Sequence, residues 1–214
     1  MKIFADIRAI FRGDPALRSR KLAFLEIFLY QGLHAILLHR IAHFLWKIYV
    51  PFLPRLISQI SRFLTGIEIH PGAKIGGGFF VDHGSGTVIG ETAEIGNDVL
   101  IYHQVTLGTL GGAINSKTRR HPKIGDRTMI GAGAKIFGPI EIGSDCKIGG
   151  GSVVTKNVPS HSAVVGNPAR IIKIKNQKII DQKGKMNFPD PIKKNFEKIN
   201  LKIKNLEKIL AEKF

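Results

Sequence analysis

Small aliphatic residues recur at every sixth position between residues 67 and 158, and this spacing limits the possible folds more than any other feature. A helix of 3.6 residues per turn cannot keep every sixth residue on one face, and a simple strand would alternate every second residue. The spacing fits a short strand and a turn, repeated as the three sides of a prism with one aliphatic residue per side pointing inward. The sequence therefore predicts a parallel β-helix of hexapeptide repeats whose stacked coils bury a continuous aliphatic column. The predicted inward positions are Ile69, Ile75, Val81, Thr87, Ala93, Val99 and Val105, then, after an irregular stretch, Ile124, Ile130, Ile136, Ile142, Ile148 and Val154.

The segment before the repeat predicts helices. Residues 15–65 have a helical pattern, with Asp14 as a candidate N-cap and Pro15 at the first helical position. The apolar run at 22–38 approaches the length of a membrane span, but polar residues interrupt it, so a helix buried in an oligomer is favoured. The residues expected to divide this region into separate helices are Gly32, Pro51 and Pro54.

The segment after the repeat predicts one short amphipathic helix. Its apolar residues have alternating spacings of three and four, typical of a heptad seam, at Phe196, Ile199, Ile203, Leu206 and Leu210. Two heptads are marginal alone, so we expect this helix to pack against a partner. The chain thus divides into a helical region at 1–66, a β-helix domain at 67–172 with a projecting loop at 108–122, and a lysine-rich tail at 173–214.

The 214-residue chain has a formal net charge of +16, most of which lies outside the repeat. Residues 1–65 and 171–214 each carry +7, whereas residues 66–170 carry only +2. Basic flanks can face nucleic acid or a membrane, but a solvated surface is the simpler interpretation, and we expect neither partner. The single cysteine, Cys146, excludes an internal disulfide, and the N-terminus has no signal-peptide pattern, so a cytoplasmic location is expected.

Ionisable side chains of the repeat gather at two places. Asp82 and His83 lie in the glycine-rich stretch VDHGSG, and they share the early coils with Glu68. The repeat is interrupted once, between Val105 and Ile124, and a solenoid accommodates such an insertion as a loop that projects from a corner. The loop ends in Arg119, Arg120 and His121.

Several stretches resemble the serine O-acetyltransferases of cysteine biosynthesis: GIEIHPGAKIGGGFFVDHGSGTVIGETAEIGNDVLIYHQVTLG, RRHPKIGDRTMIGAGAKI, GNPARI and the helical stretch GLHAILLHRIAHFLW. The resemblance extends from about Asp14 to Ile172. It implies an α+β chain in which an N-terminal α-helical region is followed by a left-handed parallel β-helix, and the heptad seam adds a C-terminal helix. It also implies acetyl transfer from acetyl-CoA to the hydroxyl of L-serine without a metal. The expected assembly is a homotrimer, or a hexamer built as a dimer of trimers, with active sites between subunits.

The same resemblance assigns roles to individual residues. His83 corresponds to the catalytic general base, and Glu68 to the acidic residue that orients it. The serine-binding residues are Asp14 and Asp82 for the ammonium group, Arg120 for the carboxylate, and His121 as a second histidine. The residues expected near acetyl-CoA are Ala132, Gly133, Lys135 and Lys147, with a backbone N–H near Gly108 for the oxyanion.

Other functions remain open at this level. A sugar could replace serine as the acceptor, although two carboxylates and an arginine suit an amino acid better. A γ-type carbonic anhydrase would bind zinc through His83, His103 and His121, and a non-enzymatic scaffold would bind nucleic acid through its basic tail. A complex with cysteine synthase is possible, but Phe214 stands where the docking members of the family have a terminal isoleucine, which disfavours it.

Overall fold

A computed structural model describes residues 2–14, 17, 23–111, 118–174 and 191–211, which fall into two compact units, 1–175 and 176–214. The first unit begins with α1 (Lys2–Gly13), the 3-10 helix η2 (Ala23–Leu29), α2 (Gln31–Lys47) and α3 (Leu53–Thr65). The strands that follow are β1 (Glu68–Ile69), β2 (Lys74–Ile75), β3 (Phe80–Val81), β4 (Val88–Ile89), β5 (Glu94–Ile95), β6 (Leu100–Ile101), β7 (Thr106–Gly108), β8 (Lys123–Ile124), β9 (Met129–Ile130), β10 (Lys135–Phe137), β11 (Glu141–Ile142), β12 (Lys147–Ile148), β13 (Val153–Val154), β14 (Ser162–Val165) and β15 (Arg170–Ile174). The second unit holds α4 (Pro191–Ala211).

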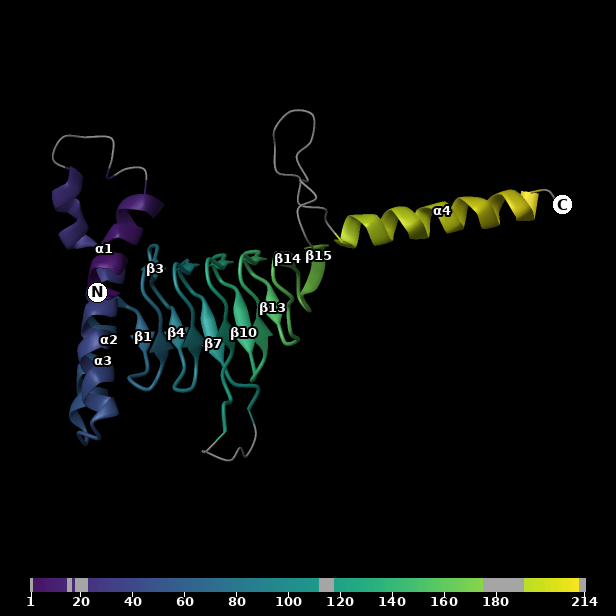
Figure 1. The fold of residues 1–214 in the computed structure, drawn as a ribbon. Coiled ribbons are helices and arrows are strands. Elements are labelled where there is room, and N and C mark those ends of the chain that lie inside the picture. The colour runs from purple at the N-terminus through teal and green to yellow at the C-terminus, as the bar shows by residue number, and fades with distance from the viewer. Residues whose placement is uncertain (1, 15–16, 18–22, 112–117, 175–190, 212–214) are drawn as a thin grey trace. The chain divides into compact units, whose positions relative to one another are not determined.

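The strands of the first unit form three sheets in which every third strand is a neighbour (Figure 1). Sheet A has the order β1-β4-β7-β10-β13, sheet B has β2-β5-β8-β11, and sheet C has β3-β6-β9-β12-β14-β15. All strand pairs are parallel except β14–β15, which is antiparallel. The predicted stack of parallel coils is therefore confirmed, and α1, α2 and α3 lie at the end where β1 begins (Figure 1).

The register of the inward column differs from the prediction in one place. Ile69 pairs with Ile89, 20 residues later, whereas Ile89 pairs with Leu107 after 18. The first coil thus contains two additional residues, which lie between Val81 and Ile89. Beyond them the aliphatic column runs through Ile89, Ile95, Ile101 and Leu107. The residues predicted for this column, Thr87, Ala93, Val99 and Val105, occupy a second buried row two positions earlier in the repeat.

The start of the helical region also differs from the prediction. The backbone N–H of Asp14 donates to the carbonyl of Ile10 at 2.9 Å, so Asp14 directly follows the last turn of α1. The helix start expected at Pro15 lies outside the described residues. Gly32 is the second residue of α2, and the predicted division of the helices near it falls at Tyr30, between η2 and α2. A Cβ atom at Gly32 would stand 2.3 Å from the carbonyl oxygen of Val81, so the glycine lets α2 pack directly on β3.

A buried ion pair fastens the helices to the first coil. Asp6 of α1 is fully buried, and its Oδ1 accepts a hydrogen bond from the N–H of Phe79 at 3.0 Å. The guanidinium of Arg40 in α2 lies 3.2 Å from Asp6 Oδ2 and donates to the carbonyl of Ile75 at 2.6 Å. Burial raises the pKa of Asp6, and the Arg40 charge opposes that shift. Two helices and one coil thus depend on a single carboxylate, whose loss would leave Arg40 buried without its charge partner.

The second unit contains the predicted heptad seam. The seam residues Phe196, Ile199, Ile203, Leu206 and Leu210 are exposed along one stripe of α4. The described helices include none that is both long enough and apolar enough to cross a membrane.

We expect acid to destabilise the first unit through His39. This α2 residue is 3% exposed, and neither ring nitrogen has a hydrogen-bond partner among the described residues. Burial lowers its pKa from 6.5 to about 3, and the charges of His43 and Arg40 act in the same direction. The folded protein thus binds this proton less readily than the unfolded chain does. The contribution of neutral His39 to the free energy of unfolding is complete above pH 6.5 and is lost as the pH falls towards 3.

Urea denaturation at pH 7 and pH 5 tests this. Between pH 7 and pH 5, the free energy of unfolding of the wild type should fall by about 2 kcal/mol more than that of the His39→Leu variant. The figure follows from about 1.4 kcal/mol per pH unit below the pKa of the unfolded state. His34→Leu, at an exposed position of the same helix, serves as the control and should keep the wild-type dependence. Equal pH dependence of the wild type and His39→Leu would contradict the assignment.

Candidate active site

The two additional residues of the first coil form a bulge that carries His83. The backbone of His83 has a φ of +61°, in the left-handed region that a residue with a side chain seldom adopts, and Gly84 follows with +65°. The His83 side chain is 77% exposed, and its Nε2 lies 3.8 Å from Oδ1 of Asp82. Asp82 is fixed by its own N–H, which donates to the carbonyl of Ile101 at 2.9 Å. The bulge therefore holds an imidazole outside the prism beside a half-buried carboxylate, an arrangement suited to proton transfer.

The same corner of the prism continues over the next coils. Gln104 donates its N–H to the carbonyl of Ser85, and Gly133 donates to that of His103, both at 2.9 Å. The predicted Ala132 and Gly133 are therefore stacked on the corner that carries His83. His103 lies on the coil between that of His83 and that of Ala132 and Gly133, and its ring centroid is 6.2 Å from that of His83.

The start of α2 lies next to this corner, beside β3. The hydroxyl of Tyr30, immediately before α2, donates to a carboxylate oxygen of Asp14. Asp14 is thus brought to the same part of the molecule as Asp82, whose charge acts on Tyr30 as well. Tyr30 was not among the candidates, because no spacing in the sequence signals a contact between residues 16 positions apart in different helices.

Arg120 and His121 lie on a different corner, between sheets A and B. The guanidinium of Arg120 pairs with the carboxylate of Glu91. The hydroxyl of Thr92 accepts the backbone N–H groups of Arg120 at 2.9 Å and His121 at 3.1 Å. The Nδ1 atom of His121 accepts the N–H of Thr92 at 3.2 Å, and burial and the Arg120 charge lower the pKa of His121. This corner therefore offers one cation and one neutral imidazole with its proton on Nε2.

Glu91 and Thr92 were not predicted as site residues. They belong to the GET motif, one of the stretches that carry the family resemblance, and this motif was the available signal. The structure shows what the two residues do: together they fix the exit of the projecting loop.

The remaining candidates lie on the outer faces of the coils. Glu68, at the start of β1, pairs with Arg62 at 3.1 Å, so the chain gives it a partner other than His83. Lys135 is on β10 of sheet A, Lys147 is on β12 of sheet C, and Gly108 ends β7. The Nζ of Lys135 lies 3.5 Å from the carbonyl oxygen of Gly133.

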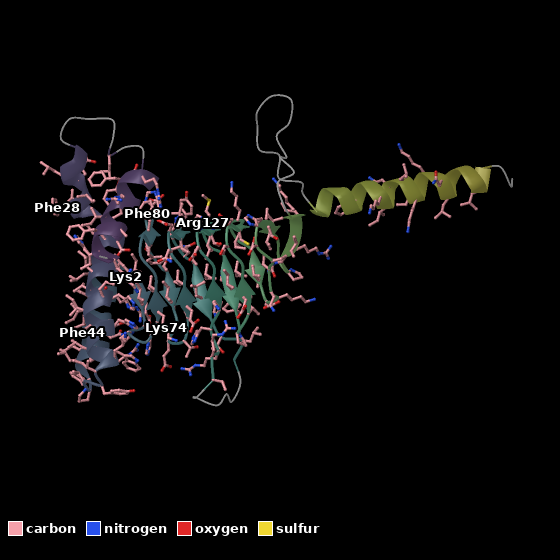
Figure 2. All side chains as sticks on the ribbon, viewed as in Figure 1. Lys2, Phe28, Phe44, Lys74, Phe80 and Arg127 are labelled. Carbon is pink, nitrogen blue, oxygen red and sulfur yellow. The ribbon has the colours of Figure 1, made fainter. Side chains whose placement is uncertain are left out.

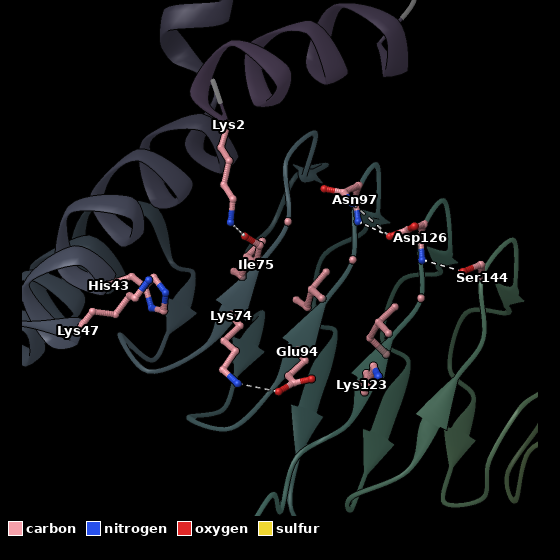
Figure 3. A pocket seen from close by; sticks show the side chains of 15 residues that line it. Lys2, His43, Lys47, Lys74, Ile75, Glu94, Asn97, Lys123, Asp126 and Ser144 are labelled. Carbon is pink, nitrogen blue, oxygen red and sulfur yellow. Dashed lines mark hydrogen bonds and ion pairs between the residues drawn. The ribbon is translucent and has the colours of Figure 1, made fainter.

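A hollow of about 590 Å³ lies elsewhere, between the N-terminal helices and sheet B (Figure 3). It includes none of the predicted site residues. On its sheet side, Lys74 pairs with Glu94 at 2.9 Å (Figure 3). The chemistry suggested by the sequence therefore lies at the two corners, not in this hollow.

Within one chain, the three histidines of the zinc alternative are divided between two corners. His83 and His103 share one corner, whereas His121 lies on the other. Across the described parts of the chain, no three His, Cys, Asp or Glu side chains come together in a way that could hold a metal ion.

Known proteins resemble this chain over most of its length. The family model of bacterial transferase hexapeptide (six repeats) matches residues 121–156. Serine acetyltransferase of Bacillus pumilus is 48% identical over 207 residues, which cover 96% of this chain and 92% of the relative. That of Bacillus subtilis is 48% identical over 209 residues, covering 97% and 93%.

Solved structures agree. Serine acetyltransferase from Brucella abortus in complex with coenzyme A has a TM-score of 0.74 and 43% identity, covering 80% of this chain and 66% of its own. The soybean serine acetyltransferase complexed with serine has a TM-score of 0.74 and 44% identity, covering 80% and 68%. With such identity over almost the whole chain, and with parallel coils that carry an Asp–His bulge, the chain belongs to the serine acetyltransferase family.

Proposed function

We propose that this chain transfers an acetyl group from acetyl-CoA to the hydroxyl of L-serine, with His83 as the general base. The observation that carries the proposal is the bulge after β3, which projects His83 on the corner shared with Ala132 and Gly133. An acceptor at the bulge and a thioester along the corner would meet at this imidazole. The left-handed winding of the coils and a cytoplasmic location accompany the proposal as consequences of the family resemblance.

The reaction needs one proton to move twice. As the serine oxygen attacks the thioester carbonyl carbon, the imidazole of His83 takes the hydroxyl proton; when the carbon–sulfur bond breaks, it returns that proton to the leaving thiolate. Asp82, 3.8 Å from His83 Nε2, stabilises the imidazolium formed in between. The oxyanion would be stabilised by a backbone N–H near Gly108, and Glu68, if it orients His83, must first leave Arg62.

The charges of the two corners suit a zwitterion. Asp14 and Asp82 offer two carboxylates for an ammonium group, and Arg120 offers a planar fork for a carboxylate. Glu91 already holds the Arg120 guanidinium in place. A neutral sugar carries no charge that complements these groups, which favours serine over the sugar alternative. Coenzyme A would run along the His83 corner past Ala132 and Gly133, within reach of Lys135 or Lys147.

The site requires more than one copy of the chain. Sheet A separates the His83 corner from the Arg120 corner, and a molecule as small as serine cannot touch both corners of one prism. A neighbouring copy can bring its Arg120 corner to the His83 corner of the first. Three such contacts close a ring, which supports a homotrimer with each site between two subunits.

Two further surfaces bear on the assembly. The outer side of α2 and α3 exposes large apolar side chains, among them Phe44 (Figure 2), Leu56, Ile60 and Phe63. A second trimer covering this side would give the hexamer. On α4, the exposed stripe is as narrow as a coiled-coil seam, with Ile or Leu at four of its five positions, so helices from other copies could pack against it.

Replacement of His83 should remove most turnover. We expect His83→Ala to lower kcat by about two to four orders of magnitude, and His83→Asn to fail similarly, because an amide does not take up a proton at neutral pH. A thiol-release assay with acetyl-CoA and serine measures this. His161 is the matched control, because it also has a left-handed backbone and lies 3.8 Å from a carboxylate, that of Asp145. Near-normal turnover in folded His83→Ala would falsify the assignment.

The shared site predicts complementation. His83→Ala and Arg120→Ala should each be nearly inactive alone, but a trimer containing both chains has one interface with two intact corners. Co-expression with two affinity tags and purification on both should restore up to about a third of the wild-type rate. Mixed oligomers as inactive as either parent would show that both corners must come from the same chain.

The α4 helix should stabilise the oligomer without acting in catalysis. We expect deletion of residues 192–214 to leave the kcat for serine acetylation unchanged. It should lower Tm or the mass measured by light scattering, because it removes the contacts between the α4 helices of neighbouring copies. A single polar substitution, Ile203→Asn, should have the same effect in weaker form. Unchanged Tm and mass in both variants would refute this role.

A further inference from the structure

Two helix ends meet through one hydrogen bond at the edge of the His83 corner. Asp14 follows the last residue of α1, and Tyr30 precedes the first residue of α2. The Tyr30 hydroxyl contacts Oδ2 of Asp14, and because an ionised carboxylate has no proton to give, Tyr30 is the donor. The contact is a charge-assisted hydrogen bond, the stronger kind.

Both helix ends are placed by direct contact with β3. A Cβ atom at Gly13 would stand 2.6 Å from two ring atoms of Phe80, and one at Gly32 would stand 2.3 Å from the carbonyl oxygen of Val81. Glycine at both positions therefore lets the end of α1 and the start of α2 press on the strand that leads into Asp82. The Asp14–Tyr30 pair is thereby delivered to the base of the bulge.

The electrostatics of this cluster keep Tyr30 neutral. Burial raises the pKa of Tyr30, and the hydrogen bond to Asp14 and the negative charges of Asp14, Asp82 and Glu26 raise it further. The phenol thus stays a proton donor at neutral pH. Two of these three carboxylates, Asp14 and Asp82, are the groups assigned to the substrate ammonium.

We propose that Tyr30 is a positioning residue for amino-acid recognition: its hydroxyl holds the Asp14 carboxylate beside Asp82, so that the two together receive the ammonium group of the acceptor. The inference rests on the proposed function and deepens it, because it makes ammonium selectivity depend on a residue that does not touch the substrate. A carboxylate at a helix end has side-chain freedom to lose on binding. Holding it in advance lowers that cost and therefore strengthens binding.

The test is a double-mutant cycle on the full-length enzyme, with Tyr30→Phe, Asp14→Asn and the double variant. Tyr30→Phe keeps the packed ring and removes only the hydroxyl. We expect it to raise the KM for serine about 5- to 20-fold while kcat and the KM for acetyl-CoA change less than about twofold. In the Asp14→Asn background the same substitution should change the serine KM less than about twofold, because its partner is already altered.

A second readout separates positioning from a general structural effect. 3-Hydroxypropionate is serine without the ammonium group, and its inhibition constant against serine should be the same in wild type and Tyr30→Phe. Tyr49→Phe is the control, since Tyr49 is 92% exposed in the connection between α2 and α3. All variants should share the wild-type Tm within a few degrees.

The outcomes distinguish this inference from the proposed function. Wild type that acetylates serine, together with Tyr30→Phe of unchanged serine KM, overturns the role of Tyr30 and leaves the function standing. Equal weakening of serine and 3-hydroxypropionate, additive effects in the cycle, or a large fall in Tm would each reduce Tyr30 to a structural residue. Wild type inactive on serine would instead contradict the proposed function, and with it the premise of the inference.

Discussion

Backbone hydrogen bonds between successive coils determine where the side chains of the described coils lie. From β1 to β10, each short strand pairs in parallel with the strand three places later, and regular partners such as Ile89 and Leu107 are 18 residues apart. Within such a stack a residue added at one corner cannot be absorbed by its neighbours. The two additional residues between Val81 and Ile89 are therefore forced outward, and the bulge they create carries His83.

The same stacking places residues that are distant in sequence on one line. Asp82, His83, His103, Ala132 and Gly133 follow one corner because the ladder repeats each corner once per coil. The projecting loop leaves from another corner, and Thr92 and Glu91 fix its exit at Arg120 and His121. One prism thus carries the two groups of candidate site residues on different edges, and in the proposed function contact between copies joins them.

The sequence predicted the coils, the helical region before them and the chemistry-bearing residues, because the six-residue period and the quoted motifs are visible without any contact information. It did not predict the register beyond Val81. Thr87, Ala93, Val99 and Val105 are small or apolar and are buried too, so both registers satisfy the pattern equally well. Contacts that depend on tertiary placement, such as Tyr30 with Asp14 and Glu91 with Arg120, leave no periodic pattern in the sequence and were not predicted.

The central claim is that one substrate molecule bridges the two corners across a boundary between copies. A crystal structure of the enzyme with L-serine and coenzyme A tests it most directly. The account predicts that the serine hydroxyl lies within hydrogen-bonding distance of His83 in one copy, and that the serine carboxylate lies on Arg120 of the neighbouring copy. Serine bound entirely within one chain, or bound away from His83, would contradict it.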